Sequence, residues 1–180
     1  MPPLAFPAVL TPFATPPASY LAANPTVVDL VVSATVIRTS APGPVPRVLL
    51  IQRAATDGFP LLWESPGGGV ERNNDATLLH ALQRELAEET GLALARVAAL
   101  LDDKYEWAGG RARKITFLVE VDADQEVVLD PAEHADFVWA TEAEVRDGRC
   151  DGRVLDFAYP GARELVLEAF GVFRGLAVEA

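Results

Sequence analysis

The chain contains 180 residues, of which half are apolar, and it carries a formal net charge of −11. This length provides one ordinary domain with a substantial core and is too short for two such domains. The negative charge argues against a protein that binds nucleic acid polymers or anionic membranes, although it is compatible with small phosphates that are bound through metal ions.

The first 26 residues are rich in proline and lack the basic start of a secretory signal. Prolines favour both extended segments and disordered tails. We therefore assign residues 1–26 to a proline-rich arm, either extended along the domain or disordered, and residues 27–180 to a single folded domain. The prolines are Pro2, Pro3, Pro7, Pro12, Pro16, Pro17 and Pro25.

Three strands are expected in the next part of the chain. Residues 27–39 are rich in β-branched side chains, and residues 48–53 form a second apolar run. The turn-forming residues 40–46 separate these two strands, so we expect a hairpin. A short strand at 61–65 then ends at the proline and glycines of residues 66–69, which interrupt regular structure.

A helix over residues 76–90 has clear boundary signals. Asp75 or Thr77 is the expected N-terminal cap, and Gly91 is suited to the left-handed conformation that ends helices. Further strands are expected at 94–101, 114–121 and 137–140, and further helices at 142–147, capped by Thr141, and at 161–170. This mixture predicts an α/β (α+β) fold in which a mixed sheet has helices on both faces.

The helix at 76–90 places three carboxylates together. At about 100° per residue, Glu85, Glu88 and Glu89 fall within an arc of roughly 100°. Like charges at these spacings cost roughly a few tenths of a kcal/mol per pair. A bound Mg²⁺ ion would offset this cost, because it prefers carboxylate oxygens. A solvated acidic face is the commoner reason for such a cluster, but the glycines at 67–69 also allow a ligand to approach the backbone closely.

Residues 68–92 resemble the Nudix box, G-x5-E-x7-R-E-U-x-E-E-x-G-U, in which U is aliphatic. The flanking residues 49–53 and 63–68 are also similar to the family, and the resemblance covers most of residues 27–170. The second half of the box matches at Arg84, Glu85, Leu86, Glu88, Glu89, Gly91 and Leu92.

The first half of the box departs from the pattern. Counting from either end places Asn74 or Ala76 where the box has glutamate, so the loop contains two extra residues. The nearest acids are Asp75 and, further upstream, Glu71. In the family that glutamate supports the box arginine, so its loss puts in doubt how Arg84 is held and whether activity is impaired.

The resemblance implies a Nudix-like α/β/α sandwich with a mixed β-sheet and Mg²⁺-dependent hydrolysis of a phosphoanhydride bond, with Mn²⁺ as a substitute. It assigns the metal to Glu85, Glu88 and Glu89, with a backbone carbonyl near Gly68. Catalytic roles fall to Glu85, Glu88 and Glu133. Glu88 and Glu133 remain alternative candidates for the general base.

The residues that would contact substrate lie largely outside the box. Arg53 is the first choice to meet phosphate, while Tyr105 and Trp107 are candidates to stack on a base. For each of them a surface position is the simpler interpretation, and a structural role is favoured for His134 beside Glu133. The complete set of expected contacts is Arg53, Gly67, Gly69, Arg84, Tyr105, Trp107 and Lys114.

The leading interpretation is a nucleotide pyrophosphohydrolase that acts on a small molecule. A nucleotide sugar, a dinucleotide or a prenyl diphosphate remains an alternative substrate, because the box binds the metal and the pyrophosphate rather than the attached group. A regulatory protein that binds a ligand without turnover, and a chance similarity in an acidic helix, are further alternatives. We expect no membrane partner and leave a homodimer open. Because Cys150 is the only cysteine, we expect a cytoplasmic protein.

Overall fold

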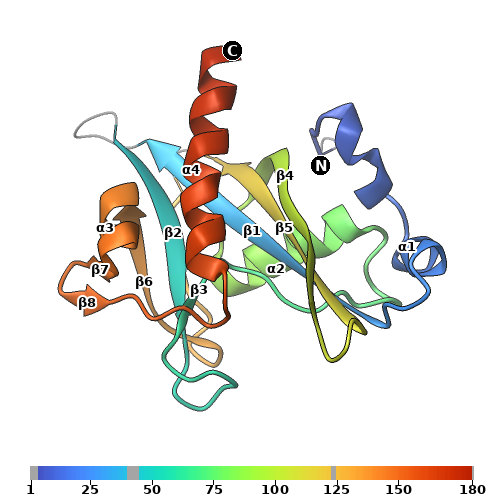
Figure 1. The fold of residues 1–180 in the computed structure, drawn as a ribbon, viewed down its shortest axis with the longest axis horizontal. Coiled ribbons are helices and arrows are strands. Elements are labelled where there is room, and N and C mark those ends of the chain that lie inside the picture. The colour runs from blue at the N-terminus through green and yellow to red at the C-terminus, as the bar shows by residue number, and fades with distance from the viewer. Residues whose placement is uncertain (1–3, 40–44, 123–124, 180) are drawn as a thin grey trace.

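A computed structural model describes residues 4–39, 45–122 and 125–179 (Figure 1). Residues 1–3 and most of the expected turn at 40–46 lie outside this part of the chain. The elements in chain order are η1 (Ala8–Phe13), α1 (Pro17–Ala23), β1 (Asp29–Thr39), β2 (Pro46–Arg53), β3 (Trp63–Glu64), α2 (Leu78–Thr90), β4 (Leu94–Trp107), β5 (Ala112–Val121), β6 (His134–Thr141), α3 (Glu142–Asp147), β7 (Arg149–Cys150), β8 (Arg153–Val154) and α4 (Ala162–Glu179).

The main sheet is mixed. Its strand order is β3-β2-β1-β5-β4, and β6 lies along β2. Strands β1 and β5 are parallel, with Val32 opposite Ile115, whereas the other pairs in this sheet are antiparallel. The expected antiparallel pairing of the first two strands is confirmed. Strand β1 is therefore central, and the chain that follows β3 runs antiparallel alongside it toward α2, with Val31 opposite Gly69.

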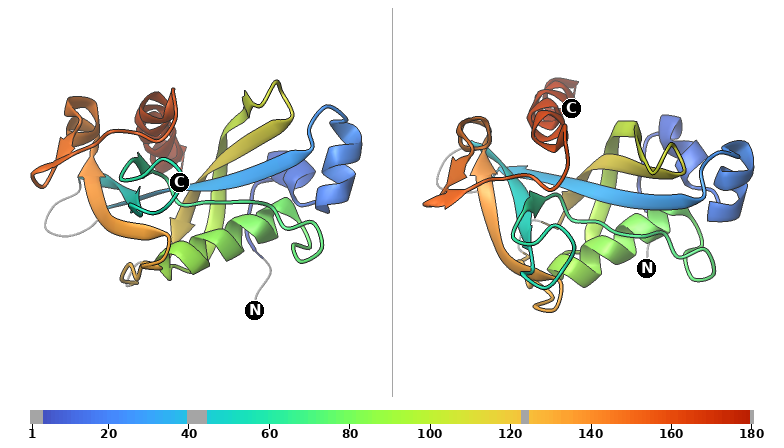
Figure 2. Two further views of the ribbon diagram at one scale, coloured as in Figure 1. Left: turned by 90° about the horizontal axis from the view of Figure 1, so that it is seen from below. Right: turned by 60° about the horizontal axis from the view of Figure 1, so that its bottom comes forward.

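Helices cover the two faces of this sheet (Figure 2). Helix α2 packs on one face, while α4 packs on the other together with α3. Each face has its own apolar core, so the predicted α/β/α sandwich is confirmed. The first core contains Leu79, Leu82 and Leu86 of α2, and the second contains Val166, Ala169 and Phe170 of α4. Among the described helices, none is long and apolar enough to cross a bilayer.

Much of the N-terminal segment is helical, in η1 and α1, so it is not a disordered tail, and only its start follows the expectation of an extended arm, since Ala5 bridges to Arg96 of β4. Leu10, Phe13 and Tyr20 are buried in the same core as α2. The ring of Phe13 meets that of Phe117 edge-on, with 5.2 Å between centroids. The prolines allow this because Pro17 occupies the first position of α1, where no backbone donor is required. Burial of three large side chains therefore decides the conformation.

Helix α2 has the ends that its sequence indicates. Thr77 caps it by accepting a hydrogen bond from the His80 amide at 3.1 Å, and Gly91 ends it with φ 69°. Of the two expected caps, Thr77 is therefore the one used, and the helix starts two residues later than predicted. Asp75 is left free in the loop for another role.

Candidate active site

A cleft of about 650 Å³ lies where α2 meets the glycine turn after β3 and the loop before β6. Two arginines, Arg53 and Arg84, and a larger number of acids line it. An anionic substrate would be repelled from this surface unless cations were bound there. The lining carboxyl groups are those of Asp57, Glu71, Glu85, Glu88, Glu89, Asp130 and Glu133.

The glycine turn is in direct contact with the helix carboxylates. The Gly67 amide donates a hydrogen bond to Glu89 Oε2 at 2.6 Å. A Cβ atom on Gly67 would lie 2.1 Å from the Val32 carbonyl oxygen, and one on Gly68 would lie 2.5 Å from Glu85 Oε2. Only glycine allows the turn to approach both the sheet and the helix this closely.

The three box glutamates have different environments. Glu85 and Glu89 are buried, whereas Glu88 is exposed. Burial raises the pKa of Glu89 to about 9; the hydrogen bond from the Gly67 amide opposes this shift, and repulsion from neighbouring carboxylates adds to it. Burial also raises the pKa of Glu85, although Arg84 opposes the shift. The ionised forms are thus unfavourable in the protein alone, and a cation placed between them would stabilise both.

Arg84 is held by Asp75. Its Nε and Nη2 atoms donate to the two oxygens of Asp75 at 3.0 and 2.9 Å. The Asp75 side chain is fully buried and also accepts a hydrogen bond from the Glu71 amide at 2.7 Å. Through Nη1, Arg84 contacts Glu85 at 2.8 Å and Glu88 at 2.9 Å. Asp75 therefore supports the box arginine, although neither expected position of the box glutamate is acidic.

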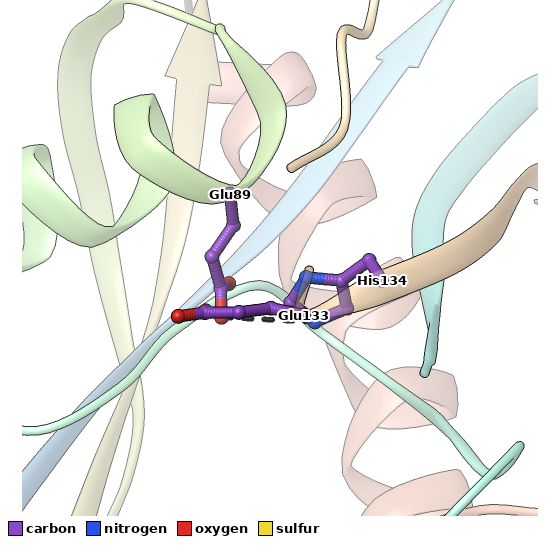
Figure 3. A group of neighbouring side chains, drawn as sticks. All are labelled: Glu89, Glu133 and His134. Atoms are coloured by element: carbon purple, nitrogen blue, oxygen red, sulfur yellow. Dashed lines mark ion pairs between the residues drawn. The ribbon is translucent and has the colours of Figure 1, made fainter. Parts of the chain in front are cut away.

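The loop before β6 brings Glu133 and His134 to the same cleft. Figure 3 shows His134 directed toward Glu89, with Glu133 beside them. His134 Nε2 lies 3.7 Å from Glu89 Oε1, and one ligand atom from each of the three residues lies within 4.8 Å of the others. Burial lowers the pKa of His134. Glu133 is thus placed next to the helix carboxylates, while its proposed catalytic role stays a prediction.

A second pocket of about 270 Å³ adjoins the first through Arg53, which lines both. Its aromatic lining consists of Phe59, Tyr105, Trp107 and Tyr159, with 4.8 Å between the centroids of the two tyrosines. Lys114 is buried there, with its Nζ atom 4.4 Å from the centroid of Tyr159. Burial lowers the pKa of Lys114. The pocket is suited to a flat ring bearing a hydrogen-bond acceptor.

The family model described as the NUDIX domain matches residues 29–158. The chain belongs to the Nudix family. This confirms the family that residues 68–92 indicate, and the Nudix box is the segment that forms the glycine turn and α2.

Individual proteins are similar to this chain over a short stretch of sequence or in their fold. An RNA pyrophosphohydrolase of Halorhodospira halophila is 52% identical over 54 residues, which is 30% of this chain and 26% of that protein. The match thus spans about a quarter of the length of that relative. The Nudix domain of Shewanella oneidensis NrtR, solved with ADP ribose, has a TM-score of 0.63 and 23% identity over 87% of this chain and 98% of that one. The E. coli ORF135 protein has a TM-score of 0.55 and 27% identity over 84% and 94% of the two chains.

The Nudix fold brings the residues predicted from the sequence to two places. The box residues and Glu133 line the first cleft, whereas Lys114, Tyr105 and Trp107 line the second. Arg53 lies between them, but its guanidinium is already paired with Asp57 and Glu64. The Gly68 carbonyl accepts a hydrogen bond from the Val32 amide at 3.0 Å, so one of its two lone pairs is in use.

Sequence reasoning missed Glu64 and Tyr159. Glu64 lies in the flanking sequence that resembles the family and is buried between Arg53 and Lys114. Its Oε2 atom lies 4.0 Å from Lys114 Nζ. Its position after Trp63 in a short strand was the available signal. Tyr159 lies far from the box in sequence, and no spacing pattern connects it with Lys114 before the chain folds.

Proposed function

We propose that this Nudix protein is a Mg²⁺-dependent hydrolase that cleaves a phosphoanhydride bond in a nucleoside diphosphate derivative or a nucleoside triphosphate. The observation that carries the proposal is the pair of buried carboxyl groups, Glu85 and Glu89, against the glycine turn. Both have pKa values raised by burial and are held in place by Arg84 and by the Gly67 amide.

The donor set fits a hard divalent cation. Glu85, Glu88 and Glu89 offer oxygen atoms from successive turns of one helix, and Gly68 offers a carbonyl beside them. Mg²⁺ takes oxygen ligands of this kind and retains sites for substrate phosphate, while Mn²⁺ is a natural substitute. When bound, the ion supplies positive charge to the pyrophosphate oxygens and lowers the pKa of a water.

The residues of the chain then have separate tasks in the reaction. Glu85, Glu88 and Glu89 hold the ion, and Arg84 fixes the first two through hydrogen bonds from its Nη1 atom. Glu133 is exposed on the cleft and opposite the helix, where its carboxylate can accept the proton of the attacking water. Glu88 is the alternative base. Most of the rate enhancement comes from positioning and electrostatics, as in other phosphoryl transfers.

The second pocket is proposed to hold the group attached to the diphosphate. Tyr105 and Trp107, with 6.0 Å between their centroids, would flank a nucleobase, and Lys114 would donate a hydrogen bond to it. Arg53, at the junction of the two pockets, would meet phosphate by exchanging one of its present carboxylate partners. Because the chain carries a net charge of −11, we propose a small nucleotide rather than a nucleic acid polymer as substrate.

A substrate panel with Mg²⁺ tests the proposal. The panel comprises nucleoside triphosphates, a nucleotide sugar, ADP-ribose, a dinucleotide and a prenyl diphosphate, scored by the phosphate products released. The Glu88→Gln variant is expected to lose at least about 100-fold in kcat with little change in ligand binding, because one metal ligand is weakened. The exposed Glu120→Gln variant, which removes a surface charge paired with Arg96, is the matched control. Tight binding without turnover on the whole panel would instead identify a ligand-binding protein.

A further inference from the structure

We propose that His134 is a nitrogen ligand for a divalent cation at the end of the cleft formed by Glu89 and Glu133. This inference rests on the proposed divalent-cation site, and because it makes Glu133 a ligand, the role of general base falls to Glu88, the alternative given above. It adds a ligand from outside the Nudix box, so that one cation position has mixed nitrogen and oxygen coordination while the position at Glu85 and Glu88 has oxygen ligands only.

The first observation is that His134 is buried and its ring nitrogens lack hydrogen-bond partners among the described residues. The residue is 3% exposed, and among the described residues neither ring nitrogen finds a hydrogen-bond partner. Buried polar atoms are almost always hydrogen-bonded, and leaving one unpaired costs roughly 1–3 kcal/mol. A bound cation would satisfy Nε2, the nitrogen that faces Glu89 in Figure 3.

The second observation is the spacing of the donor atoms. The 3.7 Å between His134 Nε2 and Glu89 Oε1 is too long for a hydrogen bond. Two ligands that each lie about 2.1 Å from one ion are separated by roughly 3–4.2 Å. The three-residue cluster, whose donor atoms lie within 4.8 Å of one another, reaches this spacing with a small movement of the exposed Glu133.

The third observation is that the backbone holds these ligands rigidly. The His134 amide donates to the Asp130 carbonyl at 2.9 Å, and the Glu133 carbonyl accepts from the Ala54 amide at 2.8 Å. On the opposite side, Glu89 is fixed by the Gly67 amide. The ligands thus come from two elements whose separation is set before any ion binds, which reduces the cost of ordering them.

Mixed coordination has a chemical consequence. An imidazole nitrogen is a better ligand for Co²⁺ and Zn²⁺ and, to a smaller degree, for Mn²⁺ than for Mg²⁺, which prefers oxygen. The position at Glu89, Glu133 and His134 therefore selects a transition metal even when the oxygen-only position holds Mg²⁺. We expect Mn²⁺ to bind there at least 10-fold more tightly than in a chain without the imidazole.

Pulsed electron paramagnetic resonance of the full chain loaded with Mn²⁺ tests this assignment directly. The chain has only two histidines, His80 and His134, so selective ¹⁵N-histidine labelling is simple to interpret. We expect a nitrogen coupling that changes from the ¹⁴N to the ¹⁵N pattern on labelling, persists in His80→Gln and disappears in His134→Gln. Calorimetric titration with Mn²⁺ should show the 10-fold or greater loss of affinity in His134→Gln alone.

Two outcomes would overturn the inference. One is the absence of histidine nitrogen coupling in wild-type protein saturated with Mn²⁺. This measurement does not depend on whether any variant folds. The other is a coupling that survives in His134→Gln. The proposed hydrolase activity is tested independently, because the substrate panel measures turnover with Mg²⁺ as the only divalent cation. Hydrolysis without nitrogen coupling, or nitrogen coupling without hydrolysis, would therefore distinguish the two failures.

Discussion

Replacing Asp75 by asparagine should destabilise the protein strongly, although position 75 is not part of the Nudix consensus. The side chain is fully buried and receives three hydrogen bonds, two from Arg84 at 3.0 and 2.9 Å and one from the Glu71 amide at 2.7 Å. Asparagine keeps the shape and an acceptor for one donor, but it removes the negative charge and places an amide donor against the guanidinium.

The magnitude follows from the partners that Arg84 retains. Removing one member of a buried ion pair costs about 3–5 kcal/mol. Arg84 keeps its contacts with Glu85, Glu88 and the Gly69 carbonyl, so the lower end of that range applies. We expect a loss of about 3 kcal/mol in the free energy of unfolding, which is on the order of a 100-fold change in the folding equilibrium. The kcat should fall about 10-fold because Arg84, which contacts two proposed metal ligands, is positioned less firmly once Asp75 no longer holds its other side.

Urea denaturation followed by tryptophan fluorescence measures this loss. Asp29→Asn, a substitution at an exposed position of β1, provides the matched control. His80→Gln tests whether the contact of His80 Nδ1 with Asp75 at 3.4 Å contributes. If the free energies of unfolding of Asp75→Asn and the wild type differ by less than about 0.5 kcal/mol, Asp75 does not carry the support of Arg84.

The pH dependence of this difference has a definite sign. Burial acts to raise the pKa of Asp75, but the hydrogen bonds from Arg84 and from the Glu71 amide outweigh it and lower the pKa below its ordinary value. A carboxyl group with a lowered folded-state pKa stabilises the protein fully above its unfolded pKa of about 3.9. The stability gap between wild type and Asp75→Asn should therefore be constant near neutral pH and should shrink as the pH falls below about 4.

Three further substitutions or measurements test the fold. Gly67→Ala should lower the free energy of unfolding by at least about 3 kcal/mol, because an added Cβ would clash with the backbone of β1 and because residue 67 has a φ of 150°. The control Gly69→Ala has open space around its added Cβ and should leave thermal unfolding nearly unchanged. Phe13→Ala should cost about 3–4 kcal/mol in chemical denaturation, and a loss below about 1 kcal/mol would show that the N-terminal segment is not part of the core. Burial raises the pKa of the Cys150 thiol to about 11, so a disulfide reagent at pH 8 should modify native protein roughly 100-fold more slowly than protein in urea. Equal rates would contradict the buried position.

The box helix was predictable because its information is local. Periodicity places Glu85, Glu88 and Glu89 on one face, and Thr77 and Gly91 supply the end signals that the structure uses. The mixed sheet was predictable for a similar reason, since short turns join some strands while long connections join others. The N-terminal segment was not, because proline content describes backbone preference and says nothing of the core that Leu10 and Phe13 enter.

The second pocket was accessible to sequence reasoning only in part. The sequence indicates Tyr105 and Trp107 because they are aromatic residues in a polar stretch, and Lys114 because positive groups that could meet phosphate are few; strands β4 and β5 bring the three together. Glu64 and Tyr159 complete the pocket from β3 and from the loop before α4. Contacts between segments so distant in the chain are set by packing, for which composition and spacing carry no signal.

The supporting acid of the Nudix box illustrates why a consensus spacing is an indirect measure of geometry. The requirement on Arg84 is a carboxylate at hydrogen-bond distance, and Asp75 meets it through a side chain one methylene shorter than glutamate. A side chain shorter by about 1.5 Å needs a backbone that approaches more closely. The two extra residues before α2 give the loop enough length for the backbone to make that approach. The Glu71 amide donates a hydrogen bond to Asp75 and so stabilises the turned conformation of the loop. Insertion and substitution therefore compensate each other, and the acid remains in place while its position in the motif changes.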